Sequence, residues 1–155
     1  MLEIFVDADA CPVKDEVLRV ADRHDLAVHI VSNSWLRLTA GPRVHRVVVG
    51  DGFDAADDWV CDHIGPGDVC ITADIALAAR CLAKGARALG PAGRAFTDAN
   101  IGMAQAMRDL SSHLRQTGES RGFNPPFTGQ DRSRFLRAFE DMIQEVKRHA
   151  AKKTS

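Results

Sequence analysis

The chain has 155 residues, of which 45% are hydrophobic, so it suits one domain of ordinary size whose core needs no disulfides. Its formal net charge of -1 excludes a polycationic nucleic-acid-binding chain, yet residues 1–107 carry 10 Lys/Arg against 15 Asp/Glu and residues 108–155 carry 10 against 6. No apolar run reaches the ~20 residues of a membrane span, and four cysteines without metal-ligand spacing favour a cytoplasmic protein.

The first half of the chain alternates predicted strands and helices. Short apolar runs at residues 2–6, 26–31 and 44–49 are typical of buried strands. Pro12 opens a helical pattern that continues to His24, because proline is favoured in the first turn of a helix. A second helix is predicted over residues 53–64, after the turn signal Asp51-Gly52.

The second half continues this alternation and then becomes helical. A fourth strand is predicted at residues 69–72, a helix at 75–84 that Gly85 ends, and a short strand at 86–89. Thr97 or Asp98 is expected to cap a long helix over residues 99–116. A last helix starts at Asp131, with apolar residues spaced to pack on the sheet at Phe135, Leu136, Phe139, Ile143 and Val146.

This order of elements predicts an α/β fold. Strands that alternate with helices form a mainly parallel sheet covered on both faces, here with four to five strands. We therefore expect a three-layer sandwich with additional C-terminal helices. It forms a single domain over residues 1–150, followed by a disordered tail at 151–155.

Polar residues follow the predicted strands at the point where each strand ends. In open parallel sheets, ligands bind outside the carboxyl ends of the strands. Oxygen ligands of the kind found here suit Mg²⁺ or Mn²⁺, and a cation would relieve the mutual repulsion of clustered carboxylates. The candidate ligands and catalytic acids are Asp7, Asp9, Asp54, Asp57 and Asp74, and Ser32 and Asn33 are candidates for substrate contact.

Each aspartate also has a structural alternative. Asp7 or Asp9 is a possible N-cap of the helix that Pro12 opens, and Asp74 is a possible N-cap of the helix at 75–84. Residues 54, 57 and 58 share one helix face, which is either a wall of the site or a solvated surface. We favour Asp57 or Asp54 as the acid on this face and expect Asp58 to be solvated.

Basic residues and one cysteine complete the set of candidates. Lys14 and Arg132 are candidates for binding a substrate phosphate, although an ordinary solvent-facing charge is the alternative for each. Asp131 and Arg132, at a predicted helix start, are the best candidates for an internal ion pair. Cys11 lies beside the site, but the sequence places no partner histidine for it, which disfavours a role as nucleophile.

Several motifs resemble the YaiI/YqxD family of uncharacterised bacterial proteins. They include Asp7-Ala8-Asp9-Ala10-Cys11-Pro12, Gly52-Phe53-Asp54-Ala55-Ala56-Asp57, Gly67-Asp68-Val69-Cys70-Ile71-Thr72-Ala73-Asp74-Ile75 and Asp131-Arg132. The resemblance covers nearly the whole chain and implies a PIN-like, nuclease-type fold. It implies that Asp7, Asp9 and Asp74 are ligands of Mg²⁺ or Mn²⁺, with Asp57 or Asp54 as the acid borne by a helix.

Three functions follow from these patterns. The first is a metal-dependent phosphodiesterase that acts on RNA or single-stranded nucleic acid. The second is a phosphatase of the haloacid-dehalogenase type, with Asp7 as nucleophile and Asp9 as general acid, although the order of its motifs speaks against it. The third is a non-catalytic module of PIN-like fold that binds RNA.

Overall fold

The computed structural model describes residues 2–8, 11–33, 43–50, 55–102 and 127–154. The strands are β1 (Ile4–Asp7), β2 (Val28–Ser32), β3 (Val44–Val48), β4 (Val69–Ile71), β5 (Arg87–Leu89) and β6 (Ala95–Phe96). The helices are α1 (Lys14–Arg23), α2 (Ala55–His63), α3 (Ile75–Ala83) and α5 (Gly129–Thr154). Within the described ranges, every strand and helix predicted up to residue 89 is therefore present, with ends that differ by a few residues.

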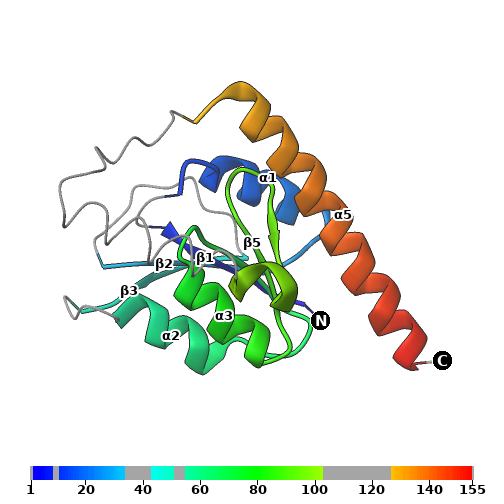
Figure 1. Ribbon diagram of the computed structural model, residues 1–155, viewed down its shortest axis with the longest axis horizontal. Helices are drawn as coiled ribbons and strands as arrows, with labels where there is room; N and C mark the ends of the chain where they lie inside the picture. Colours follow the sequence, from blue (N-terminus) through cyan, green and yellow to red (C-terminus); the bar gives the residue numbers. More distant parts are fainter. Residues whose placement is uncertain (1, 9–10, 34–42, 51–54, 103–126, 155) are drawn as a thin grey trace.

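The strands form one sheet in the order β3-β2-β1-β4-β5-β6 (Figure 1). Neighbouring strands from β3 to β5 run parallel, whereas β6 pairs with β5 in the antiparallel direction. The predicted mainly parallel sheet is confirmed, and β6 is an additional strand at its edge. A strand of two residues leaves no periodicity in the sequence, which is why the pattern did not predict it.

Of the described helices, α1 and α5 lie on one face of the sheet and α2 and α3 on the other (Figure 1). Ile4 and Val6 of β1 are buried in a cluster with Phe135 and Phe139 of α5, whereas Phe5 is buried in a second cluster with residues of α2 and α3. Successive side chains of a strand point to opposite faces, so a strand covered on both faces is apolar throughout. The α/β, three-layer sandwich is thereby confirmed.

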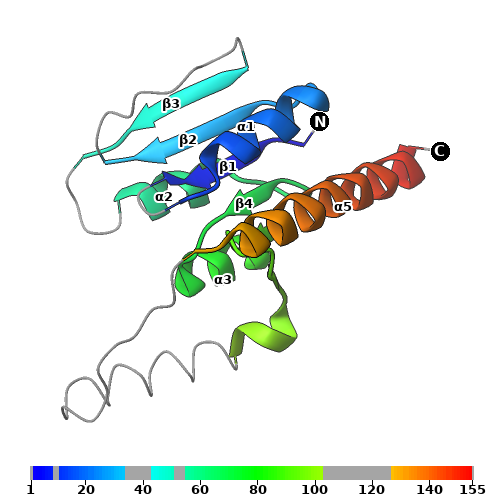
Figure 2. The same ribbon diagram turned by 90° about the horizontal axis from the view of Figure 1, so that it is seen from above.

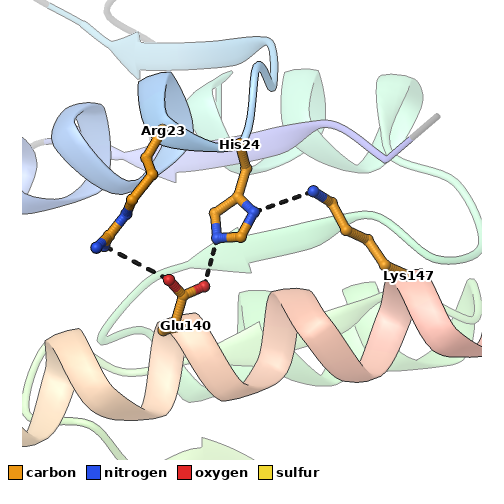
Figure 3. Close-up of polar contacts among 4 residues, drawn as sticks. All are labelled: Arg23, His24, Glu140 and Lys147. Atoms are coloured by element: carbon orange, nitrogen blue, oxygen red, sulfur yellow. Dashed lines mark hydrogen bonds and ion pairs between the residues drawn. The ribbon is translucent and has the colours of Figure 1, made fainter.

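Helix α5 lies beside α1 on one face of the sheet (Figure 2). A polar cluster joins the end of α1 to the middle of α5 (Figure 3). In it, Glu140 contacts His24 and lies 3.5 Å from Arg23, and Lys147 Nζ donates to His24 Nδ1 at 3.0 Å. The first and last described helices are therefore held together by polar contacts as well as by the apolar core.

The turn between β5 and β6 packs closely against the backbone of α5. Gly93 in this turn has a φ of +92°, and a Cβ atom added to it would lie 2.7 Å from the carbonyl carbon of Arg134. Only glycine adopts such a φ readily, and only glycine leaves room for this approach. The turn therefore requires glycine at position 93, so that α5 can pack on the sheet.

The helical stretch at residues 98–102 and helix α5 each begin with side chains that cap them. Thr97 and Asn100 exchange backbone-to-side-chain hydrogen bonds ahead of a helical stretch at residues 98–102, which confirms Thr97 as a cap. The remainder of the helix predicted at 99–116 lies outside the described residues. Thr128 and Asp131 make the same reciprocal bonds at the start of α5, and α5 continues to Thr154, into the segment for which the sequence predicts a tail.

In the part of the chain that the structure describes, every helix is too short or too polar to cross a bilayer.

Candidate functional site

Asp7 ends β1 and is held by a hydroxyl group from the neighbouring strand. Val6 of β1 pairs with Ile71 of β4, so the next residues of the two strands, Asp7 and Thr72, meet at the carboxyl edge of the sheet. Thr72 is buried, and its Oγ1 donates to Asp7 Oδ2 at 2.9 Å. The first helix starts at Lys14, with Val13 as its N-cap residue and no side-chain cap there. A capping role therefore does not explain Asp7.

The backbone of Asp74 is hydrogen-bonded to the same hydroxyl group of Thr72. Its N–H donates to Thr72 Oγ1 at 3.0 Å. Its carboxylate Oδ1 accepts from the backbone N–H groups of Ala76 and Leu77 at 2.9 and 3.3 Å, so Asp74 is the N-cap of α3. The predicted structural role of Asp74 is thus confirmed, and its role as a metal ligand stays a prediction.

Thr72 is the residue at this site that the sequence analysis did not select. It was signalled by its position directly after β4 and two residues before Asp74. Its hydroxyl group donates to the Asp7 carboxylate at the end of β1 and accepts from the Asp74 N–H just after β4, so it connects the ends of the two strands. It fixes one carboxylate oxygen of Asp7 in a defined orientation.

The end of β2 adds polar groups to the same edge. Asp7 pairs with Val31 of β2, so Ser32 and Asn33 continue just beyond it. Ser32 is buried, and its carbonyl oxygen accepts from the N–H of Val49 at 2.9 Å. Asn33 is exposed. Of the two candidates for substrate contact, Asn33 is the more accessible.

Asp57 and Asp58 lie in the first turn of α2 and differ in their surroundings. Asp58 is 60% exposed and forms an ion pair with Arg80 at 3.1 Å, in agreement with the solvated position predicted for it. Asp57 is half-buried. Burial raises the pKa of the Cys61 thiol on the same helix, and the nearby Cys81 and, more weakly, the Asp57 carboxylate add to this rise.

Two of the predicted acids cannot be placed, because Asp9 and Asp54 lie outside the described residues. Among the residues that are described, no group of three or more His, Cys, Asp or Glu side chains is arranged to hold a metal ion. The oxygen donors at this edge, led by the Asp7 carboxylate, are of the hard type that Mg²⁺ and Mn²⁺ prefer. The donor chemistry therefore fits a hard cation, and Asp7 is the described residue best placed to hold it.

The turn between β1 and α1 carries Cys11 and Lys14. Burial raises the pKa of the Cys11 thiol, a bond from the backbone N–H of Val13 and the charge of Lys14 oppose this, and the carboxylates of Asp7 and Glu16 add to the rise. A thiol with a raised pKa is mostly protonated at neutral pH, which disfavours Cys11 as a nucleophile. Lys14 Nζ donates to the carbonyl of Ala8 at 3.4 Å, so it is folded back over this turn.

Arg132 lies in the first turn of α5 and pairs with Glu16 of α1. The expected ion pair between Asp131 and Arg132 is wrong: Asp131 pairs instead with Arg134 at 2.7 Å. Adjacent residues of a helix point in different directions, whereas residues three apart share a side. The Arg132 guanidinium also lies 5.3 Å from the centroid of the Phe127 ring.

The chain is similar to many bacterial proteins over nearly its full length. It is 60% identical to a UPF0178 protein of Parvibaculum lavamentivorans, an alignment that covers 96% of this chain and 97% of the relative. It is 56% identical to UPF0178 proteins of Rhizobium etli, over 93% of both chains, and of Rhodospirillum rubrum, over 95% of this chain and 99% of the relative. No solved structure matches the chain. The model of the uncharacterised YaiI/YqxD family matches residues 5–145, so the chain belongs to that family.

Proposed function

We propose that the protein is a metal-dependent phosphodiesterase that cleaves RNA or single-stranded nucleic acid at the carboxyl edge of its sheet. The observation that carries this proposal is the meeting of the Asp7 carboxylate and the Asp74 segment at the hydroxyl group of Thr72. These residues come from neighbouring strands that are far apart in the sequence. They lie at the edge where open parallel sheets bind their ligands.

The side chains at this edge are of the types that bind a metal ion and a phosphodiester substrate. A bound Mg²⁺ or Mn²⁺ would supply a nucleophilic water and neutralise charge on the phosphoryl oxygens. Asp7, fixed by Thr72, would hold the ion together with Asp9 and Asp74, and Asp57 or Asp54 would orient the attacking water. Ser32 and Asn33 would contact the substrate.

The distribution of charge supports a polyanionic substrate. Residues 108–155 carry 10 Lys/Arg and 6 Asp/Glu, so this third of the chain is basic. Lys14 adds a cation at the turn that follows β1, and Arg132 adds one at the first turn of α1 through its pair with Glu16. Cations that contact phosphates make binding fall steeply with salt concentration, and we propose this behaviour for the protein. The four cysteines are free thiols, which suits the reducing cytoplasm as its compartment.

The test compares Mn²⁺-dependent cleavage of short single-stranded RNA by the wild type and by Asp7→Asn. The substitution keeps the size of the side chain and removes the negative charge, so we expect cleavage to fall by about 100-fold or more. Asp22→Asn on the exposed side of α1 is the matched control and should retain full activity.

Equal cleavage by the wild type and by Asp7→Asn would contradict the proposal. If the wild type binds RNA tightly in the presence of a chelator and shows no turnover with Mg²⁺ or Mn²⁺, the protein is an RNA-binding module rather than a nuclease.

A further inference from the structure

The ion pair between Glu16 and Arg132 is unusual because its acid is buried. The Glu16 side chain is 7% exposed, whereas that of Asp58 in the surface pair with Arg80 is 60% exposed. Arg132, its partner, is 44% exposed. The Glu16 carboxylate therefore lies in the protein interior, whereas Arg132 reaches solvent.

The stability of the fold alone does not account for Glu16. Taking a carboxylate out of water costs several kcal/mol, and a buried pair recovers this only when every remaining polar atom is hydrogen-bonded. Oε1 of Glu16 accepts from Arg132, but Oε2 is buried and accepts no hydrogen bond from any residue that the structure describes. An apolar side chain would fill this place between α1 and α5 at a lower cost. Buried polar atoms without a hydrogen bond are rare in folded proteins, so this oxygen calls for an explanation other than packing.

The pair lies beside the proposed site. β1 ends at Asp7, Lys14 Nζ at the start of α1 donates to the carbonyl of Ala8 at 3.4 Å, and Glu16 lies in the first turn of the same helix. Arg132 pairs with Glu16 and so reaches from α5 to the first turn of α1, the end of that helix that follows β1. Helices α5 and α1 lie side by side (Figure 2).

The geometry of the guanidinium leaves donors available for a ligand. One nitrogen, Nη1, is bound to Glu16, and the ring of Phe127 lies 5.3 Å away. A guanidinium carries five N–H donors in a planar fork, an arrangement that matches the oxygens of a phosphate group. The Glu16 carboxylate and the Phe127 ring hold the guanidinium in place, and the exposed part of the Arg132 side chain faces solvent.

We propose that Glu16 is a positioning residue, which holds Arg132 so that the exposed edge of its guanidinium binds a phosphate group of the substrate beside Asp7. This inference rests on the proposed function for the identity of the substrate, but the phosphate site itself can be tested without turnover.

The experiment compares Glu16→Gln, Arg132→Ala and their double variant with the wild type. Glu145→Gln is the matched control, since Glu145 pairs with Arg87 elsewhere on α5. Cleavage of a short oligouridylate in Mn²⁺ gives KM and kcat, and calorimetric titration with inorganic pyrophosphate, without metal, gives binding. Urea denaturation checks that each variant is folded, and Arg132→Ala keeps the test valid should Glu16→Gln unfold.

We expect Arg132→Ala to raise KM and the pyrophosphate Kd by about tenfold or more, the loss typical of a charge-assisted hydrogen bond. Glu16→Gln should raise both in the same direction with a smaller change in kcat. The double variant should be no worse than Arg132→Ala, because Glu16 acts only through Arg132. A merely structural role for Glu16 would change stability and leave the ratio of KM to kcat unchanged.

The outcomes separate this inference from the proposed function. Cleavage by the wild type with unaltered KM and Kd in Glu16→Gln overturns the positioning role and leaves the nuclease intact. Absence of cleavage, with pyrophosphate binding that Glu16→Gln and Arg132→Ala both weaken, overturns the nuclease and supports the phosphate site. Absence of both cleavage and pyrophosphate binding overturns both.

Discussion

A single hydroxyl group connects the two strands that carry the candidate site. Thr72 donates to the carboxylate of Asp7 and accepts from the N–H of Asp74, and its side chain is buried between them. A carboxylate that accepts a directed hydrogen bond has fewer rotamers available to it. The position of Asp7 at the edge of the sheet is thus set by Thr72 as much as by β1 itself.

Replacing Thr72 with valine tests this arrangement. The variant keeps the shape of the side chain but leaves the Asp7 oxygen and the Asp74 N–H without their common partner. We expect the free energy of unfolding to fall by about 1–3 kcal/mol, as measured by urea denaturation. Thr72→Ser retains the hydroxyl group and should recover most of this loss. A valine variant as stable as the wild type would show that Thr72 is not needed to hold this edge.

The pair of Arg87 on β5 and Glu145 on α5 gives a prediction for pH. The hydrogen bond from Arg87 lowers the pKa of Glu145 below its ordinary value of 4.5. A lowered folded-state pKa contributes stability above the unfolded value, and this contribution is lost as the pH falls through the folded value. Both side chains are well exposed, at 35% and 49%, so solvent screens most of the effect.

We therefore expect Glu145→Gln to lower the free energy of unfolding by no more than about 0.5 kcal/mol at pH 7. The difference from the wild type should vanish at acidic pH, once Glu145 itself is protonated. Urea denaturation at a series of pH values measures both. A difference that grows on acidification would contradict the sign of this pKa shift.

At the scale of the elements, the contact between the β5–β6 turn and α5 depends on one glycine. Gly93→Ala would place a methyl group 2.7 Å from the Arg134 carbonyl carbon, at a backbone φ of +92°. We expect a loss of about 2–4 kcal/mol from clash and backbone strain together. Gly102→Ala is a suitable control, because no atom of the described residues lies within 4 Å of the added atom. Thermal unfolding of the two variants compares them directly.

The order of the elements was predictable, but several contacts between them were not. Alternating apolar runs and helical patterns predicted β1 to β5 and their parallel sheet, and hence that Asp7 and Asp74 would lie at one edge. The pairing of Glu16 with Arg132 was not predictable, because the two residues are 116 positions apart and meet only once α1 and α5 pack. Which side of a helix meets its neighbour is decided by tertiary packing, on which a single sequence carries no direct signal.

At the scale of the whole molecule, metal binding should couple to stability. If Asp7 and its neighbours hold Mn²⁺ only in the folded state, the ion stabilises the protein by mass action. At a free concentration of about 100 times its Kd, Mn²⁺ should raise the free energy of unfolding by about 2.7 kcal/mol. Asp7→Asn should abolish most of this gain, and Asp22→Asn should retain it. Equal stabilisation of both variants would place any bound ion elsewhere.

The position of α5 has a consequence for the folding of the protein during its synthesis on the ribosome. Phe135 and Phe139 fill the core beside Ile4 and Val6 of β1, yet they are synthesised long after that strand. Until α5 emerges from the exit tunnel, one face of the sheet lacks a covering layer and presents apolar side chains to solvent. A chain that stalls or terminates before α5 would therefore expose apolar surface that chaperones bind, and the fold should be completed only after α5 has left the exit tunnel.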